Sequence, residues 1–287
     1  MSDFVLLTDG ACDLPEGALE NLGFSVIPMN VMAEGAEATT SDQLSAKDLY
    51  CDLRAGRTYK TAAISVPQYK RVFEEIMKEG QDLLYLCFSS GLSGAHRNAT
   101  LAARAMEVKY PERRAVVIDT LSASAGLGYL AVLAARKKAE GARLDEIAAY
   151  IGDMAPRIGH QFTVNDLFYL KKGGKLSSAT ALLGTMLQYK PVLHMDERGC
   201  LTSVGKVRGR KSALETLISR MDATLDRERT EFVHVCHGDC LADAEELATL
   251  ITERFGYTDI TICDIGATIG VHAGPDTLAV FYVATER

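Results

Sequence analysis

Residues Leu83–Met106, which read LLYLCFSSGLSGAHRNATLAARAM, contain an apolar run, a turn rich in serine and glycine, and a helical pattern in direct succession. An uninterrupted apolar run of this length is typical of a strand buried on both faces of a parallel sheet. The turn then predicts a loop at the carboxyl end of that strand, which is where open α/β sheets bind their ligands. This one stretch therefore predicts both a fold class and the place of a site.

The same alternation of strand and helix extends through the first half of the chain. FVLLTD, at Phe4–Asp9, and RAVVIDT, at Arg114–Thr120, are further short apolar runs of strand type. Residues Pro67–Glu79 and Asn98–Tyr110 have the apolar spacing of helices. Strand and helix in repetition predict a parallel sheet with helices on its faces.

The pattern changes after Arg143, where strands are no longer separated by single helices. PVLHMDE and CLTSVGKVRG are two strand-like runs joined by Arg198 and Gly199, which favour a hairpin turn. A hairpin implies antiparallel or mixed pairing. Because about 150 residues per domain is the usual length, we expect two α/β domains: 1–160 with a parallel sheet and the serine and glycine loop, and 161–287 with a mixed or antiparallel sheet.

Composition narrows the classes of function. Lys and Arg number 31 against 38 Asp and Glu, and the resulting net charge of −7 argues against a nucleic-acid partner. No apolar run approaches the roughly 20 residues of a membrane span, so we expect no stable membrane insertion. Seven scattered cysteines fit a reducing compartment, and a cytoplasmic location is the prediction.

The turn at Ser89–Gly94 is compatible with several kinds of chemistry. A nucleophile elbow would need a glycine two positions after Ser93, where Ala95 stands, and no lysine follows the glycines at P-loop spacing. Free N–H groups at the start of the next helix would attract an anion, and glycines allow it to approach the backbone closely. A turn that only caps a helix is the remaining alternative, and the residues alone leave it open.

Other polar stretches carry weaker signals. HVCHGDC, at His234–Cys240, gathers two histidines and two cysteines, but no second pair stands at zinc-site spacing, so no metal or other cofactor is predicted. Asp9 and Asp13 lack the D-x-D spacing of phosphatases and could cap a helix. GVHAGPDT places His272 on a constrained turn, outside any helix or strand, where it either bonds to backbone or faces a ligand.

As a whole the chain resembles the DegV family, whose motifs occur here in the family's order. They are TDGACDLP, FSSGLSGAHRNA, VIDTLSASAGLG, FTVNDLFYLKKGGKLS, KPVLHMDERG, KVRGRKSALE and GVHAGPDTLAVFY. The resemblance implies two α/β domains with a long-chain fatty acid held in a tunnel between them. It also implies a binding protein with no catalytic activity of its own, which in some members presents the fatty acid's carboxylate to a separate fatty acid kinase subunit.

The resemblance also assigns residues to roles. It implies that the carboxylate meets Thr61, Ser93, the N–H of Gly94 and His272. Two departures bear on these roles: Thr61 is followed by AAIS where the family commonly has SQPS, and KGGK stands at 172–175 in place of KGGR. Arginine and lysine are not equivalent at a bidentate site.

A partner surface is implied for the segment KVRGRK, which brings four basic residues together in an acidic chain. The resemblance places the kinase contact there, with Arg208, Arg210 and Lys175 as docking residues, although such a run can equally be a solvated strand end. Alternatives from other classes are a serine hydrolase that uses Ser93, an intrinsic kinase, and a ligand-sensing regulatory protein.

Overall fold

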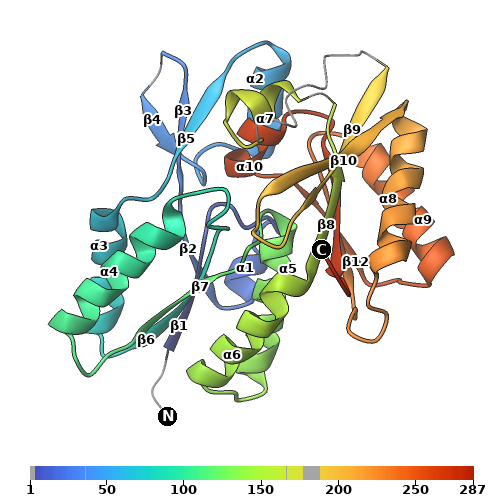
Figure 1. Cartoon of the computed structure of the whole chain (residues 1–287). Coiled ribbons are helices and arrows are strands. Elements are labelled where there is room, and N and C mark those ends of the chain that lie inside the picture. The colour runs from blue at the N-terminus through green and yellow to red at the C-terminus, as the bar shows by residue number, and fades with distance from the viewer. Residues whose placement is uncertain (1–3, 36, 166, 177–187) are drawn as a thin grey trace.

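The computed structural model describes residues 4–35, 37–165, 167–176 and 188–287, and it contains three sheets (Figure 1). The first is parallel throughout, with the order β2 (Phe24–Ile27), β1 (Phe4–Asp9), β6 (Asp82–Cys87) and β7 (Ala115–Asp119). Every residue of β6 is buried, as the opening apolar run predicts. The α/β fold class and the strand–turn–helix interpretation of this run are confirmed.

Helices cover both faces of the parallel sheet. α3 (Val66–Lys78) and α4 (Ala95–Lys109) pack together on one face, and α5 (Ala125–Ala139) and α6 (Leu144–Met154) lie on the other, with the short α1 (Ala18–Asn21) beside β2. α5 is buried along most of its length, up to Ala135, because it also packs against the second sheet. Gly126 permits this contact, since a Cβ there would lie 2.2 Å from Nε2 of His160.

The second sheet is mostly antiparallel, and its outer face is covered by α8 (Arg210–Thr224) and α9 (Leu241–Phe255). Its order is β10 (Leu201–Arg208), β9 (Tyr189–Met195), β8 (Ile158–Thr163), β13 (Leu278–Val283), β11 (Val233–His237) and β12 (Ile260–Asp264). The predicted hairpin joins β9 to β10, with Gly199 at φ 69°. A short 3-10 helix, η1 (Ala155–Arg157), leads into β8. β8 spans residue 160, so the division into 1–160 and 161–287 stays a prediction.

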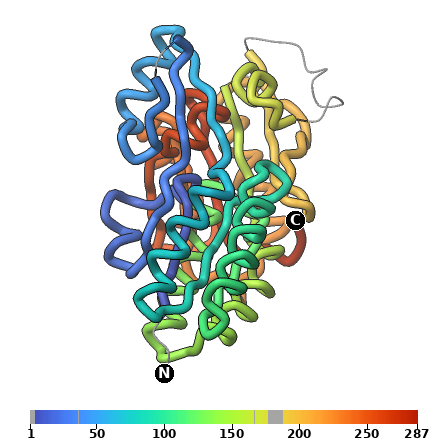
Figure 2. Tube along the Cα trace, turned by 90° about the vertical axis from the view of Figure 1, so that its left-hand side faces the viewer, coloured from blue at the N-terminus to red at the C-terminus, as the bar shows by residue number. Residues whose placement is uncertain are grey.

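The third sheet was not predicted from the sequence. It is antiparallel, in the order β4 (Ala38–Thr40), β3 (Asn30–Ala33) and β5 (Tyr59–Ala62). α2 (Ala46–Arg54), α7 (Phe168–Lys172) and α10 (Ala267–Ala273) gather around it. Figure 2 shows the blue and cyan N-terminal segment lying against the red C-terminal one in this part of the molecule.

Close packing of α10 on α2 depends on Gly270. A Cβ at this position would lie 2.7 Å from both Cδ2 of Leu49 and the hydroxyl oxygen of Tyr50. The third sheet and α10 thereby bring residues from the two ends of the chain to the loop that follows β6. Along the described part of the chain, no helix combines the length and the apolar character needed to cross a bilayer.

Candidate functional site

The loop after β6 is fixed by the hairpin of the second sheet. The buried hydroxyl of Ser89 donates a hydrogen bond of 2.8 Å to the carbonyl oxygen of Gly199. Gly91 touches the same hairpin so closely that a Cβ would lie 2.5 Å from that carbonyl oxygen. Asp9, at the end of β1, accepts from the N–H of Phe88 at 2.9 Å. Side chains and backbone from both large sheets therefore hold this loop in place.

Ser93 and Gly94 form the start of α4 and present donors away from it. The N–H of Ala95 donates to Oγ of Ser93 at 3.2 Å, which leaves the hydroxyl hydrogen of Ser93 available to another acceptor. Across the described ranges, the N–H of Gly94, the N-cap residue, has no hydrogen-bond acceptor. An unpaired N–H at a helix N-terminus, next to a free hydroxyl donor, is a site for an anion.

Thr61 and His272 approach this turn from the third sheet and from α10. Oγ1 of Thr61 lies 2.7 Å from Nε2 of His272. The prediction that His272 lies on a turn outside any helix is wrong, because it occupies the last turn of α10, where Gly274 ends the helix at φ 79°. Burial, together with the nearby Lys175, lowers the pKa of His272 to about 4, so the imidazole is neutral at pH 7.

One small cavity, which we call the polar chamber, is lined by all four predicted ligand-binding residues: Thr61, Ser93, Gly94 and His272. About 190 Å³ of it is open to the centre of a water-sized sphere. Its lining residues are Met29, Thr61, Ala63, Phe88, Leu92, Ser93, Gly94, Lys175, Thr268 and His272. The structure therefore brings together Thr61, Ser93, Gly94 and His272, which are up to 211 residues apart in sequence.

Thr268 is a member of the polar chamber that sequence reasoning missed. Its side chain is 2% exposed, and Oγ1 has no hydrogen-bond partner among the described residues. A buried hydroxyl without a partner costs free energy unless a ligand or water satisfies it. Its only sequence signal is a threonine within GATIG, which is too weak to identify it.

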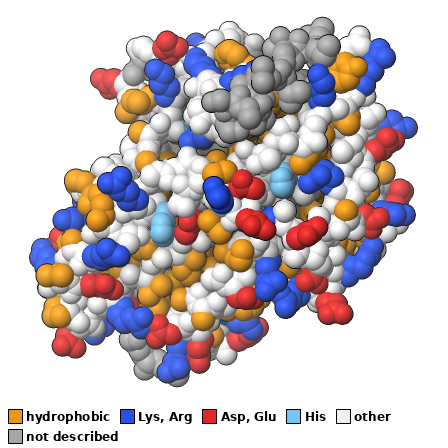
Figure 3. Space-filling view, in the orientation of Figure 1, with side chains coloured by type: hydrophobic (Ala, Val, Ile, Leu, Met, Phe, Trp, Pro, Cys, Tyr) orange, Lys and Arg blue, Asp and Glu red, His pale blue; other side chains and the backbone are white. Residues whose placement is uncertain are grey.

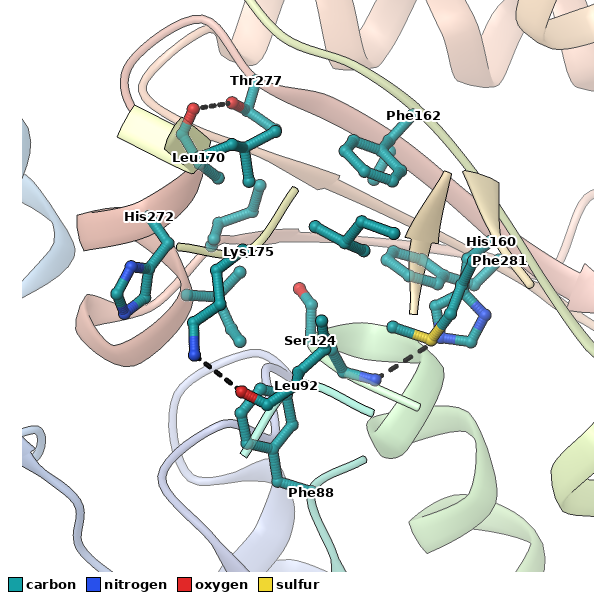
Figure 4. Close-up of a pocket in the computed structure, with 17 residues that line it drawn as sticks. Phe88, Leu92, Ser124, His160, Phe162, Leu170, Lys175, His272, Thr277 and Phe281 are labelled. Atoms are coloured by element: carbon teal, nitrogen blue, oxygen red, sulfur yellow. Dashed lines mark hydrogen bonds between the residues drawn. The ribbon is translucent and has the colours of Figure 1, made fainter. Parts of the chain in front are cut away.

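A second space, the apolar cavity, adjoins the polar chamber and shares four of its lining residues: Phe88, Leu92, Lys175 and His272. Its other walls are mostly aliphatic and aromatic, and they come from loops of the parallel sheet, from strands of the second sheet and from α7 and α10 (Figure 4). They are formed by Ala123, Ser124, His160, Phe162, Leu170, Met195, Leu201, Ile265, Ile269, Ala273, Thr277, Ala279 and Phe281. About 80 Å³ is open to the centre of a water-sized sphere, roughly five to eight times what one enclosed water needs.

Two polar side chains that line the apolar cavity, His160 and Ser124, are uncharged and hydrogen-bonded within the protein. Burial, with a smaller effect from Arg287, lowers the pKa of His160 well below its usual value. Its Nδ1 lies 2.8 Å from the carbonyl oxygen of Ile158, which can only accept, so Nδ1 carries the proton. Ser124 donates its hydroxyl to the carboxylate of Asp13 at 2.6 Å. Apolar cavities of this kind exclude water and favour hydrocarbon ligands.

The predicted docking residues lie in different surroundings. Arg208 is exposed and donates to the side-chain oxygen of Gln188 at 2.8 and 3.1 Å. Arg210 is partly buried in an ion pair of 2.8 Å with Asp243. Neither lines the polar chamber, whereas Lys175 does. Figure 3 shows acidic and basic side chains interspersed over one face of the molecule.

Catalytic and metal-binding alternatives find no matching geometry in the described ranges. No histidine there is hydrogen-bonded to Ser93, and His272 contacts Thr61. No group of three or more His, Cys, Asp or Glu side chains among those residues is arranged to hold a metal ion. Asp13 does not cap α1, because Gly17 is the N-cap residue of this helix. The carboxylate of Asp13 accepts instead from the hydroxyl of Ser124 and from the N–H of Gly266.

Comparison with known proteins identifies the family of the chain. The profile of the DegV family of uncharacterised proteins matches residues 3–285. The chain belongs to the DegV family. A DegV domain-containing protein of Clostridium perfringens is 34% identical over 289 residues, which cover 100% of this chain and 99% of that protein.

Two solved structures of the family have closely similar folds. A fatty-acid-binding DegV family protein from Thermus thermophilus superposes with a TM-score of 0.87 at 28% identity and covers 99% of this chain and 100% of its own. A fatty-acid-binding DegV family protein from Streptococcus agalactiae superposes with a TM-score of 0.85 at 27% identity, covering 99% of both chains.

Proposed function

We propose that this protein binds a long-chain fatty acid, with the acyl chain in the apolar cavity and the carboxylate in the polar chamber. The observation that carries the proposal is the junction of the two spaces. An apolar cavity ends beside a free hydroxyl hydrogen on Ser93 and an unpaired N–H on Gly94, and Thr268 offers a buried hydroxyl without a partner in the described part of the chain.

The two spaces would contribute differently to binding. Burying a methylene group is worth about 0.8 kcal/mol, so a sixteen-carbon chain gains on the order of 10 kcal/mol before ordering costs. Hydrogen bonds in the polar chamber add less net free energy, because water would satisfy the same carboxylate. The acyl chain therefore supplies affinity, and the polar chamber sets the orientation of the ligand.

The homologues from Thermus thermophilus and Streptococcus agalactiae support the choice of ligand, since both are described as fatty-acid-binding. Lipids should be extracted from the protein as purified and analysed by mass spectrometry, followed by titration of the delipidated protein with sixteen- and eighteen-carbon acids. A co-purifying fatty acid and saturable binding are the expected results. Well-folded protein that contains no lipid and binds none would refute the proposal.

We further propose that the bound fatty acid lies in a tunnel between domains 1–160 and 161–287, and that its carboxylate is presented to a separate kinase subunit. The lining of the apolar cavity by residues from both halves of the chain supports the first part. In this proposal the chain itself performs no chemistry: the kinase subunit transfers the phosphoryl group, and Arg208, Arg210 and Lys175 contact it. A ligand-sensing regulatory role would use the same site with another partner, so phosphorylation of the bound acid by a cognate kinase subunit distinguishes the two.

A further inference from the structure

The outward face of α4 carries a line of exposed side chains that are alternately basic and apolar. Arg97, Leu101, Arg104 and Val108 follow one another at spacings of four, three and four residues, which places them along one side of the helix. Leu101 is 45% exposed, and Val108, at 84%, is the most exposed large hydrophobic residue in the described part of the chain. Figure 3 shows hydrophobic and basic side chains next to one another over α4, at the left of the view. We call these four residues the α4 stripe.

The two arginines of the α4 stripe have no acidic partner among the described residues. No salt bridge or side-chain hydrogen bond there includes Arg97 or Arg104, whereas the neighbouring cation Lys109 is paired with Glu74 of α3. The one acidic residue of α4, Glu107, is hydrogen-bonded to the first backbone N–H of β7. Two positive charges of the stripe are therefore available to the carboxylates of another molecule, although the chain as a whole is acidic.

The opposite face of α4 accounts for its place in the fold. It packs against α3 and β7 through small buried side chains and one methionine, which are Ala95, Ala99, Ala102, Ala103 and Met106. None of the four residues of the α4 stripe is buried. Substitutions in the stripe should therefore leave the fold intact, and its pattern of charge and apolar area needs another explanation.

α4 begins at the polar chamber. Gly94 is its N-cap residue and Ser93 precedes it, and both line that chamber. With a rise of about 1.5 Å per residue, the α4 stripe extends from about 5 Å to about 20 Å beyond Gly94. A partner seated on the stripe would therefore stand beside the place proposed for the carboxylate.

The spacing of the α4 stripe favours another helix as its partner. Leu101 and Val108 are seven residues apart, and so are Arg97 and Arg104. A repeat of this length is the one that helices present to each other, because it keeps the same residues on the contact line over successive turns. A partner helix with apolar residues at this period, flanked by Asp or Glu, would cover both apolar side chains and pair with both arginines.

Two other occupants fit the α4 stripe less well. A second copy of the chain would bring arginines close to arginines, since the stripe contains no carboxylate. A helix that lies on a membrane has a broad apolar face, with its basic residues on the opposite side. In the stripe, basic and apolar residues alternate along a single line, and α4 contains no Phe, Tyr or Trp.

We propose that the α4 stripe docks an acidic amphipathic helix of the kinase subunit and so brings the active site of that subunit to the polar chamber. This inference rests on the proposed function, in which the carboxylate of the bound acid is presented to a separate kinase subunit. It adds a docking surface on the parallel-sheet half of the molecule to the contacts proposed for Arg208, Arg210 and Lys175.

Two double variants probe the two kinds of contact. Arg97→Ala with Arg104→Ala removes the charges, and Leu101→Ser with Val108→Ser removes the apolar area. Thermal unfolding and titration with hexadecanoic acid should show that both variants fold and bind the acid as the wild type does, because none of the four residues lines the apolar cavity or the polar chamber.

Matched control variants carry the same kinds of change elsewhere. Arg229→Ala with Arg254→Ala removes two exposed arginines outside α4 and changes the net charge equally. Leu241→Ser removes a leucine of α9 that is 51% exposed. Neither control touches α4 or the two spaces that line the proposed binding site.

The initial rate of phosphorylation by the cognate kinase subunit should be measured at increasing concentrations of protein loaded with hexadecanoic acid. In each stripe variant, the concentration that gives half of the maximal rate should rise about tenfold or more, whereas the maximal rate should change little. The effect of the two arginines should shrink at high salt. Both controls should stay within about twofold of the wild type.

Three outcomes would overturn this inference and leave fatty acid binding intact. In the first, both stripe variants are phosphorylated like the controls. In the second, sedimentation shows a wild-type dimer that Leu101→Ser with Val108→Ser abolishes, so that a second copy covers the stripe. In the third, the wild type binds phosphatidylglycerol vesicles and the double arginine variant does not, so that a membrane covers it. A wild type that binds the acid but is not phosphorylated refutes the presentation to a kinase and this inference together, whereas one that binds no acid refutes the proposed function itself.

Discussion

The apolar cavity and the polar chamber adjoin each other but are built in different ways. Most walls of the apolar cavity are side chains that project from regular strands and helices, such as Phe162 on β8 and Phe281 on β13. The donors of the polar chamber come from a turn, a helix start and the ends of elements. The first space depends on the packing of two sheets, whereas the second depends on a few hydrogen bonds. Substitutions in the two spaces should therefore differ in the kind and the size of their effects on ligand binding.

The largest effect is expected from filling the apolar cavity. Ala279 lies on β13, is 5% exposed and lines that cavity. Ala279→Phe should weaken binding of a sixteen-carbon acid more than a hundredfold, because displacing about four methylenes costs about 3 kcal/mol. Equilibrium titration of delipidated protein with the acid measures this loss.

A graded control accompanies this variant. Ala279→Val should give a smaller loss than Ala279→Phe, in proportion to the space filled. Each added group also risks overpacking that costs about 1–3 kcal/mol of stability, so thermal unfolding must show that the variants remain folded. Unchanged affinity for the acid in Ala279→Phe would mean that the acyl chain lies elsewhere.

A smaller effect is expected from the polar chamber. Ser93→Ala removes the hydroxyl that would donate a hydrogen bond to the ligand. The same hydroxyl accepts from the N–H of Ala95, so this bond is lost as well. Affinity for the acid should fall about tenfold, and stability should fall by about 1 kcal/mol. Calorimetric titration, with thermal unfolding in parallel, measures both.

Ser65→Ala is the matched control for Ser93→Ala. Oγ of Ser65 caps α3 by accepting from the N–H of Gln68, and Ser65 lines neither the apolar cavity nor the polar chamber. It should lose similar stability and keep its ligand. If both serine variants bind the acid equally well, Ser93→Ala affects only the stability of the helix start, and the hydroxyl of Ser93 does not contact the ligand.

The contrast between the two spaces also shows how far the sequence could predict the site. The strand, turn and helix around Ser93 are local, and so is the hairpin at Gly199, and both were predicted correctly. Thr61 and His272 were assigned by resemblance alone, because their contact joins residues 211 positions apart. No local pattern encodes such a contact.

The third sheet and the walls of the apolar cavity escaped prediction for physical reasons. β4 and β5 have three and four residues with no apolar alternation, so they form only by pairing with β3. His272 was misplaced because glycines in GVHAG suggest a turn, although Gly270 serves the close packing of α10 on α2. Lys175 and Thr268 gain their significance from burial, which the sequence does not show.

A pH-dependent effect on stability is expected at His272. Its pKa is about 4 in the folded protein and 6.5 when unperturbed, so the unfolded chain binds more protons between these values. The neutral imidazole therefore contributes stability that is fully present above pH 6.5 and is lost as the pH falls toward 4. His272→Gln keeps a possible bond to Thr61 but cannot titrate.

Denaturant unfolding of wild type and His272→Gln should be compared from pH 7.5 to 4. The wild type should lose more stability than the variant, and the difference should develop below pH 6.5. His160 and His234 also have lowered pKa values, but they occur in both proteins and cancel in the comparison. Parallel curves over the whole range would show that His272 is not buried as a neutral group.

The smallest effect on the binding site itself is expected at Arg208. This side chain is exposed, contacts Gln188 and lines neither space, so Arg208→Ala should change stability by less than about 0.5 kcal/mol and leave fatty acid affinity unchanged. If it docks a kinase subunit, phosphorylation of the bound acid should slow most at low kinase concentration and low salt, since a charge at the rim of an interface acts mainly on association rate.

Arg210→Ala is a poorer probe, because it also breaks the partly buried ion pair with Asp243. Arg254→Ala, which removes an exposed charge paired with Asp222 on the outer helices, controls for net charge. Equal phosphorylation rates in the Arg208 and Arg254 variants would remove Arg208 from the docking surface and leave the binding site as proposed.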